Sequence, residues 1–472
     1  MSQDGLSSSS TDLPNTGCRR VRLPVLRAEG GDHAAIDCFL RSVFHGPPLA
    51  EFQASLDDPF YEPRDRLLLR LRRQIVAHVQ IAHRTMLFGP ARIPAATLAW
   101  LGVASEQRGR GFGAHLLREA ERQMRADGAL LAMIRTSIPG FFSRRGWVIC
   151  GQSSCRRANA FAVLARLRDH GLIPRRRHGF HIRPWLQWEE AALARIYAAS
   201  TAYGPLERTD AYWQWLLRRH GHDRLYVALE GPELLELREV STHVVGYAVT
   251  RGDHIVELMT APDRSRVAAE LLARCCGDAV ENDQHCVALH GPPSCLLFKI
   301  FDEANASASP QTSDHGEGTV PIFVSAKMGL SPLAMGQPPL AQKSKQAHGE
   351  VCMMRLLDPP ELLRRLSGLF DRRAAKARLP RPSDLGLMVE GQKYQLDFRE
   401  DGVRVDTQHA GRTYLRLNPA DFTRLLLGQL DWDAALADGR LECSTTPARL
   451  SGRALFPPLP FWRPPWDDLP AQ

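Results

Sequence analysis

Apolar and polar positions follow two different periods along the first part of the chain. Apolar side chains in Asp32–Phe44 recur every three or four positions, which predicts a helix. The segments Arg66–Arg70 and Gln74–His83 are β-hairpin candidates, because apolar residues alternate along the second of them. A helical segment separates the strand candidates Thr97–Val103 and Leu130–Ile134. Strands that alternate with helices predict a layered α/β or mixed α+β fold.

A second segment repeats this order of elements. Its helix candidates are Trp188–Ala199 and Arg264–Val280, and its strand candidates are Leu225–Leu229, Val244–Thr250, Ile255–Met259 and Cys286–His290. The repeated order favours a second copy of the same fold. A third segment begins at Pro359, where the apolar row up to Phe370 predicts a helix, and strand candidates follow it. This segment is expected to be a small α+β domain.

Changes of composition divide the chain into five parts. We expect a polar, disordered tail over residues 1–18, a first domain over 19–159 and a basic connector over 160–180. The connector's arginines favour a solvated linker, and contact with an acidic partner or a nucleotide phosphate is the other interpretation. A second domain would cover 181–358, with a low-complexity insertion at about 302–349, and a third would cover 359–472.

Composition narrows the class of protein. The 472 residues carry 60 Lys and Arg against 52 Asp and Glu, and 44% are hydrophobic, as in an ordinary globular protein. The net charge of +8 is modest, so we expect no nucleic acid partner. The chain lacks an apolar run of about 18 residues and a secretory signal pattern, so we expect a cytoplasmic protein with no membrane segment. The ten cysteines show no C-x-x-C spacing, and we expect no metal site.

One short motif carries chemistry. The sequence Arg-Gly-Arg-Gly-Phe-Gly at 108–113 follows a strand candidate and opens a helix. Glycines let a backbone approach a ligand closely, and the unpaired N–H groups of a first helical turn favour a pyrophosphate. A purely structural turn is the alternative. The motif is not a Walker A loop, because no Gly-Lys-Ser/Thr ends it. A dinucleotide site is disfavoured, because Leu130–Ile134 has no acid at its end.

These residues resemble the GNAT superfamily of N-acetyltransferases. The run from Val103 through Gln107–Ala114 fits its strand–loop–helix motif, and Phe142–Trp147 matches its aromatic-x-Arg-x-Gly-aromatic segment. An acetyltransferase domain, a degenerate second copy and a C-terminal α+β domain together are similar to the Eis (enhanced intracellular survival) family. The third domain of that family has a sterol-carrier-protein-like fold, and Asn418–Leu455 is similar to it. The resemblance therefore implies two tandem GNAT-like mixed-sheet domains and a sterol-carrier-protein-like domain.

The resemblance also implies an activity and a set of site residues. An acetyl group would pass from acetyl-CoA to an amine of an aminoglycoside, a polyamine or a lysine-like protein side chain, by direct attack on the thioester. The residues implied to bind acetyl-CoA are Leu101, Gly102 and Val103 along the pantetheine arm, Gly109, Arg110, Gly111, Phe112, Gly113 and Ala114 around the pyrophosphate, and Ser137 and Ile138 near the reactive end. A homo-oligomer, a hexamer in the family, is also implied.

Two catalytic positions depart from the family pattern. The family's acid is a Tyr, but the position here is Phe142, which cannot donate a proton. The family's base is the terminal carboxylate, which would be that of Gln472. A general acid contributes about 10²–10⁴-fold, so a slower enzyme remains consistent with the sequence. The alternative is a catalytically impaired acetyl-CoA-binding regulatory or scaffold protein, and an enzyme for a longer acyl-CoA is a third interpretation.

The acceptor site is less well defined by the sequence. An acidic pocket for a polyamine could be lined by residues of the loop after the first helix or near the C-terminus, namely Glu51, Asp57, Asp58, Glu62, Asp467 and Asp468, and ordinary solvated charges are the alternative. Trp213 and Trp215 cannot share one helix face, so we expect one in the core and the other at a cavity or interface. Ala261–Val267 occupies the matching place in the second copy without glycines, so we expect no cofactor there.

Overall fold

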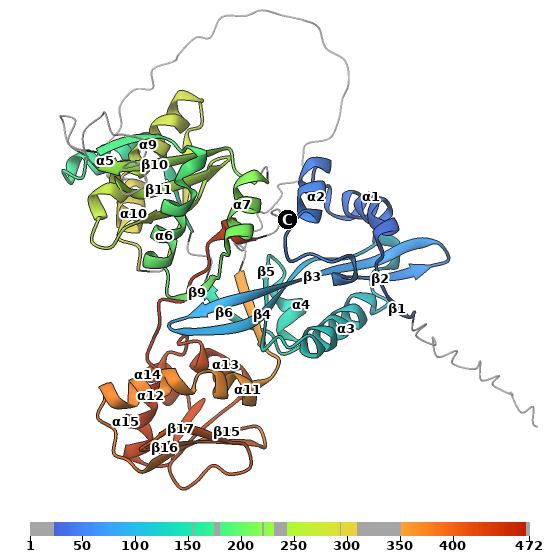
Figure 1. Cartoon of the computed structure of the whole chain (residues 1–472), viewed down its shortest axis with the longest axis vertical. Helices are drawn as coiled ribbons and strands as arrows, with labels where there is room; N and C mark the ends of the chain where they lie inside the picture. Colours follow the sequence, from blue (N-terminus) through green and yellow to red (C-terminus); the bar gives the residue numbers. More distant parts are fainter. Residues whose placement is uncertain are drawn as a thin grey trace, which may run out of the picture.

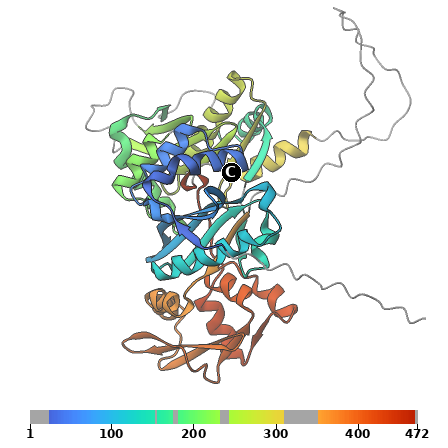
Figure 2. The same ribbon diagram turned by 90° about the vertical axis from the view of Figure 1, so that its right-hand side faces the viewer.

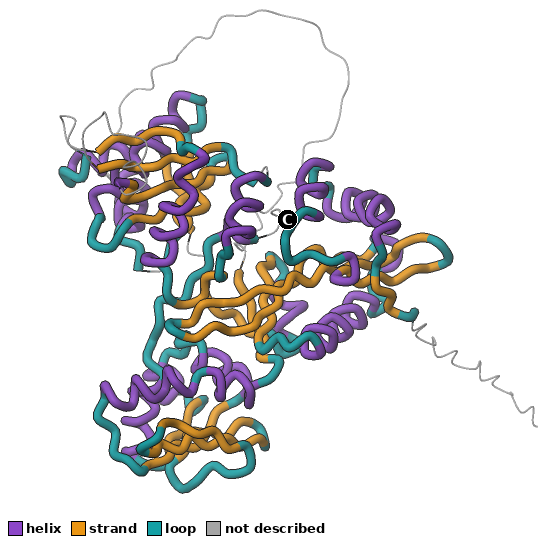
Figure 3. Tube along the Cα trace, in the orientation of Figure 1, coloured by secondary structure: helices purple, strands orange, loops and turns teal. Residues whose placement is uncertain are grey.

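The fold is seen in a computed structural model that describes residues 23–152, 155–173, 180–219, 221–230, 243–292, 294–308 and 351–468. The expected tail at 1–18, most of the low-complexity insertion and Gln472 lie outside these residues. Figures 1 and 2 show three units, with the unit around β3 and β4 between the other two. In each unit helices cover a sheet, as Figure 3 shows by colour. Within the described residues, no helix has the length and apolar character needed to span a membrane.

The first unit is built on a mixed sheet of order β1-β2-β3-β4-β5-β14-β6, with β9 paired to β3. Its strands are β1 Val25–Arg27, β2 Arg66–Leu71, β3 Gln74–Phe88, β4 Ala91–Val103, β5 Leu131–Thr136, β6 Val148–Gln152, β9 Tyr203–Leu206 and β14 Val351–Leu356. The β3–β4 hairpin is longer than the alternation predicted, and it turns at Gly89, whose φ of 59° suits a glycine. The buried side chains of α1 His33–Phe44 and α2 Leu49–Leu56 join one cluster, whereas those of α3 Phe112–Ala126 and α4 Pro139–Ser143 join another.

The sheets exchange strands across the expected domain boundaries. The expected division places β14 in the second domain, yet β14 lies between β5 and β6 of the first sheet. Its neighbouring residues Met353 and Met354 point to opposite faces and are both fully buried, so this strand needs a central position in a sheet covered on both sides. Conversely β7, Cys155–Asn159, lies within the expected first domain but pairs with a strand of the second sheet.

The second unit repeats the order of the first. Its sheet has the order β7-β13-β12-β11-β10-β8, with β8 Phe180–Pro184, β10 Arg224–Glu230, β11 Val244–Arg251, β12 His254–Thr260 and β13 Cys286–His290. Its helices are α5 Ala160–Asp169, α6 Glu190–Ser200, α7 Asp210–Arg218, α9 Ser265–Glu281 and α10 Leu297–Ala308. The succession β11–β12–α9–β13 corresponds to β3–β4–α3–β5. The expected second copy is therefore confirmed in its order of elements.

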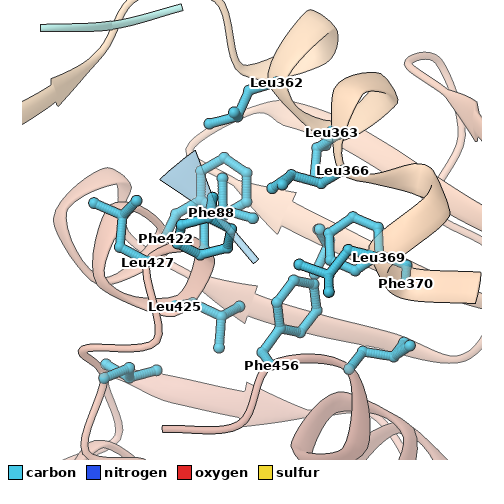
Figure 4. Close-up of a cluster of buried hydrophobic side chains, with 14 of the residues drawn as sticks. Phe88, Leu362, Leu363, Leu366, Leu369, Phe370, Phe422, Leu425, Leu427 and Phe456 are labelled. Atoms are coloured by element: carbon cyan, nitrogen blue, oxygen red, sulfur yellow. The ribbon is translucent and has the colours of Figure 1, made fainter. Parts of the chain in front are cut away.

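The third unit is a smaller α+β domain on a sheet of order β17-β16-β15-β18-β19. Its strands are β15 Ser383–Val389, β16 Gln392–Arg399, β17 Gly402–Asp406, β18 Tyr414–Leu417 and β19 Leu441–Cys443, and its helices are α11 Pro359–Arg365, α12 Ser367–Lys376, α13 Pro419–Leu426, α14 Trp432–Ala437 and α15 Thr446–Leu455. Figure 4 shows Phe88, from the end of β3, among the leucine and phenylalanine side chains of this domain. The hairpin of the first sheet is thus part of the third domain's core. The likeness of this domain to sterol carrier proteins remains a prediction.

Candidate active site

A fork between two parallel strands lies at the centre of the first sheet. Strands β4 and β5 are paired at Ala95↔Leu131, Ala96↔Ala132 and Thr97↔Met133. The pairing ends there, although β4 continues to Val103 and β5 to Thr136, and all of these residues are described. Beyond Thr97, the edge of β4 that faces β5 therefore has no strand partner among the described residues. Backbone groups on such an edge can pair with an extended ligand.

A β-bulge distorts β4 just beyond the fork. Gln80 is opposite Ala99 and His78 is opposite Gly102, so β4 has one residue more than β3 at this point. Trp100 adopts a φ of 55°, which is uncommon for a bulky residue. A Cβ at Gly102 would lie 2.7 Å from the ring of Phe44, so this glycine is required because α1 crosses here. The residues predicted to contact the pantetheine arm therefore lie on the bulged part of β4.

A chain of buried polar side chains supports the bulge. His78, fully buried, lies with Nδ1 3.0 Å from the carbonyl oxygen of Trp100 and Nε2 3.4 Å from the Arg66 guanidinium. Arg66 Nε donates to the Tyr61 hydroxyl (3.1 Å), and its guanidinium also lies over the ring of Phe52. Burial and the neighbouring Arg66 cation lower the pKa of His78 to about 3. His78 is therefore neutral at pH 7, and its Nδ1–H donates to the carbonyl of the bulge. No local pattern in the sequence indicates these contacts between His78, Arg66 and Tyr61.

The glycine motif forms an open loop ahead of α3. Gly109 and Gly111 have φ values of 78° and 84°, in the region that favours glycine, and a Cβ at either position would meet nothing within 4 Å. These glycines are therefore explained by backbone conformation, and the space above them is open. His115 N–H makes the first helical bond, to the carbonyl of Gly111 (3.0 Å). The N–H groups before it, including that of Gly113, belong to the turn that lacks helical partners. Arg110 is exposed in this loop, where its cation also favours an anion.

The segment after β5 places the other predicted residues. Ser137 and Ile138 are exposed between β5 and α4, and Ile138 N–H donates to the Thr136 hydroxyl (3.1 Å). Phe142 is 2% exposed and makes edge contacts with the rings of Phe141 and Trp147. Phe142 is thus a buried aromatic ring without a proton to donate.

The C-terminal segment reaches the fork from the far end of the chain. Arg463 donates from one guanidinium nitrogen to the hydroxyl of Thr97 (3.2 Å). Thr97 is the last residue of β4 that pairs with β5. The carboxylate of Asp468 forms ion pairs with Arg463 and with Arg135 on β5. This carboxylate is therefore already paired and does not offer a free charge to an amine. Gln472, the predicted base, lies outside the described residues.

A buried ion-pair network anchors the same segment to the second sheet. The Arg208 guanidinium donates to both carboxylate oxygens of Glu257 (2.9 and 2.6 Å) and to Asp467 (2.8 Å), and all three side chains are fully buried. The guanidinium also lies over the ring of Trp466, which belongs with Asp467 to the short helix η5, Pro465–Asp467. Because removing one partner of a buried pair leaves an uncompensated charge, this network fixes where the C-terminal segment runs. No local sequence signal identifies it, since Arg208 and Asp467 are 259 positions apart.

The acidic residues proposed for an acceptor pocket are mostly paired. Asp58 forms a buried ion pair with Arg84, Glu51 pairs with Arg251 of the second unit (2.5 Å), and Glu62 pairs with Arg64 (2.5 Å). Asp57 is exposed. A pocket of about 700 Å³ has acidic side chains among its lining residues, which include Glu62, Asp65, His83 and Asp127. It lies at the C-terminal end of α3, whose 15 residues place it about 22 Å along the helix from the glycine loop.

The two tryptophans of α7 have separate roles. The ring of Trp213 is fully buried against Tyr197 and Trp466. Trp215 Nε1 donates to the carbonyl of Ala54 in α2 (2.8 Å), so this side chain belongs to the contact between the first and second units. Both side chains belong to one buried cluster, and Trp215 in addition contacts the first unit.

The bulged strand, the fork beside it and the open glycine loop at the start of a helix lie together in the first unit. Residues 27–150, which hold all three, match the family model of the acetyltransferase (GNAT) domain. This match lies within the first unit and covers about a quarter of the chain. No curated protein sequence matches the chain significantly.

Solved structures share the fold of nearly the whole chain. A GCN5-related N-acetyltransferase from Anabaena variabilis is 14% identical, with a TM-score of 0.63 over 94% of this chain and 99% of that one. A GCN5-related N-acetyltransferase from Kribbella flavida is 17% identical, with a TM-score of 0.61 over 94% and 97%. Eis1 from Mycobacterium abscessus is 14% identical, with a TM-score of 0.56 over 92% and 97%. These likenesses confirm the expected fold class of tandem GNAT-like domains with an additional domain.

Proposed function

We propose that the protein transfers an acetyl group from acetyl-CoA to an amine acceptor, an aminoglycoside, a polyamine or a lysine-like amine. The observation that carries this proposal is the fork at Thr97 together with the open loop at Gly109 and Gly111. Leu101–Val103 would hold the pantetheine arm, Gly109–Ala114 the pyrophosphate, and the exposed residues Ser137 and Ile138 the reactive end. Acetyl-CoA, when bound, supplies an activated thioester.

The reaction requires three proton transfers. The acceptor ammonium loses one proton before its nitrogen forms the bond to the carbonyl carbon, the nitrogen loses a second as the amide forms, and the departing sulfur takes up one as the C–S bond breaks, so that one proton is released overall. The terminal carboxylate of Gln472 is the proposed base. The described residue nearest to it in sequence with a placed partner is Asp468, which pairs with Arg135 on β5. The sulfur can leave without a side-chain acid, because a thiol pKa of about 8.5 makes thiolate a fair leaving group.

The alternative function rests on Phe142. Because its buried ring has no proton to donate, the protein could bind acetyl-CoA as a regulatory or scaffold protein without efficient turnover. One pair of measurements separates the two functions. Calorimetry measures acetyl-CoA affinity, and a thiol reagent measures CoA release with a panel of aminoglycosides, polyamines and lysine peptides. Acceptor-dependent release supports the enzyme, tight binding without release supports the alternative, and absence of binding contradicts both.

A further inference from the structure

Three side chains that can bind a metal converge in the second sheet, away from the glycine loop. They are Cys155 on β7, His254 on β12 and His290 on β13. One ligand atom from each lies within 4.8 Å of the other two, and His254 Nδ1 is 2.8 Å from His290 Nε2. All three residues are half-buried, so an ion could enter from solvent.

The register of the sheet explains why they meet. Strands β7 and β13 are antiparallel, and Cys155 lies directly opposite His290. Strands β12 and β13 are parallel with His254 opposite Ala288, so His290 is two residues further along on the same face. Directly opposite and diagonal neighbours on one face of a sheet are within reach of each other's side chains. A backbone fixed by its hydrogen bonds therefore presents the three groups together.

A neighbouring carboxylate orients one of the imidazoles. Asp253 Oδ1 is 3.3 Å from His254 Nε2, and the other oxygen of this carboxylate is 2.6 Å from an Arg157 guanidinium nitrogen. A carboxylate beside Nε2 favours the proton on that nitrogen, whereas the Arg157 guanidinium, which can only donate, lies 3.4 Å from the same nitrogen and favours it as an acceptor. A metal bound at Nδ1 requires the proton on Nε2, where Asp253 can accept it, as carboxylates commonly do beside metal-binding histidines.

We propose that Cys155, His254 and His290 bind one Zn²⁺ ion, through the sulfur and one nitrogen of each imidazole. A thiolate and two imidazoles form a ligand set that suits Zn²⁺, whereas Mg²⁺ and Ca²⁺ prefer oxygen ligands. Three protein ligands leave the fourth position of a tetrahedral ion to water. This site differs from the sequence-based expectation of no metal, because its ligands come from positions 155, 254 and 290 and have no spacing motif.

The metal site would lie where the chain passes from the first sheet to the second. Strand β6 ends at Gln152 in the first sheet, and Cys155 is the first residue of β7 in the second. An ion that ties Cys155 to β12 and β13 would hold this crossing in place. The inference does not depend on the proposed acetyl transfer, and the two can fail separately.

The test uses the full-length chain, freed of metal with a chelator under reducing conditions. We expect it to take up one Zn²⁺ per chain, measured by elemental analysis and by competition with a chromophoric chelator. Co²⁺ in place of Zn²⁺ should give a thiolate-to-metal charge-transfer band and the intense visible bands of a tetrahedral ion. Zn²⁺ should also raise the thermal unfolding midpoint.

Matched variants assign the ligands. Cys155→Ser should abolish the charge-transfer band, and His290→Asn should weaken Zn²⁺ binding strongly. Asp253→Asn, which removes the carboxylate beside His254 and its ion pair with Arg157, should weaken Zn²⁺ binding by about 10–100-fold. The control is Cys286→Ser, an exposed thiol on the same strand as His290, which should leave binding unchanged. Circular dichroism checks that each variant folds.

Three results would overturn the proposal. The first is the absence of stoichiometric binding by the folded wild-type chain, which would leave the 2.8 Å contact as a hydrogen bond between two histidines. The second is Zn²⁺ binding that survives Cys155→Ser and His290→Asn. The third is a charge-transfer band that is lost with Cys286→Ser instead.

Discussion

The two GNAT-like sheets contain the same fork but use it differently. In the first sheet, β4 and β5 separate after Thr97, and an eight-residue connection with two left-handed glycines leads into α3. In the second sheet, β12 and β13 pair only up to Ile255, and the short connection from Ala261 to Arg264 leads into α9. The second connection contains no glycine. The first loop leaves open space at the start of its helix, whereas the second contains none of the left-handed glycines that create that space.

A buried polar network lies on β12 beyond the point where its pairing with β13 ends. Glu257, on the part of β12 beyond the last pair with β13, binds Arg208 and accepts a hydrogen bond from the Tyr247 hydroxyl (2.5 Å). The C-terminal helix η5 supplies Asp467 to the same network. The same arrangement of strands therefore carries the proposed ligand site in one copy and an ion-pair network that holds the C-terminal segment in the other. This network matters to the first copy, because the next residue, Asp468, pairs with Arg135 beside the first fork.

Removing the cation of the buried Arg208–Glu257–Asp467 network should cause the largest energetic change, a loss of stability. Arg208→Ala leaves Glu257 and Asp467 buried without a cation, and we expect a loss of about 3–5 kcal/mol in the free energy of unfolding. Denaturant titration measures it. Arg92→Ala is the control, because the Arg92–Glu207 pair lies at the surface, where water and salt screen it, and its loss should change the free energy of unfolding far less. Equal effects of the two substitutions would refute the role of the network.

Placing a negative charge in the glycine loop before α3 should cause the next largest change, a loss of CoA affinity. Gly111→Glu places a carboxylate where the pyrophosphate is proposed to bind, and like charges cost several kcal/mol, so CoA affinity should fall about 100-fold or more. Calorimetry measures affinity, and circular dichroism checks the fold. Gly111→Ala carries the same strain from the φ of 84° without the charge and should lose less affinity. Pro262→Glu, in the matching loop of the second sheet, should change nothing. An unchanged affinity in Gly111→Glu would exclude this loop as the site.

The buried histidine beneath the first fork predicts a pH dependence. The pKa of His78 is about 3 in the folded protein and 6.5 in an unfolded chain, so the unfolded state takes up the proton first on acidification. The stability that neutral His78 contributes is present above pH 6.5 and is lost as the pH falls toward 3. The loss in the free energy of unfolding reaches about 2 kcal/mol at pH 5. We expect His78→Asn to reduce the fall in unfolding free energy between pH 7 and pH 5. A fall as large as in the wild type would contradict the assignment.

Restoring the missing acid should have the smallest effect. If the lack of a proton donor limits turnover, Phe142→Tyr should raise the rate of CoA release, and we expect about tenfold, below the usual contribution of a general acid because the ring is buried. Phe141→Tyr, at the neighbouring ring, is the control and should leave the rate unchanged. An unchanged rate in Phe142→Tyr would show that the departing sulfur needs no acid at this position.

The comparison of the two copies also shows what local sequence can predict. The glycine loop could be found because its function depends on adjacent residues, whose backbone conformation at Gly109 and Gly111 is decided within a few positions. The repeated order of strands and helices could be found because periodicity is local. The length of the β3–β4 hairpin was underestimated, since its end is stabilised by β9 and by the core around Phe88, both distant in sequence.

The sequence by itself determined the fold class, the repeat and the loop ahead of α3, because each depends on short-range backbone preference and hydrophobic periodicity. Only the tertiary structure decided that β14 enters the first sheet, that Arg208 joins Glu257 to Asp467, and that Cys155 meets two histidines. These contacts join residues far apart in the chain. The physical reason is that burial and strand pairing stabilise contacts between complementary surfaces that the fold brings together. The local sequence around a residue does not indicate which distant residue it will contact.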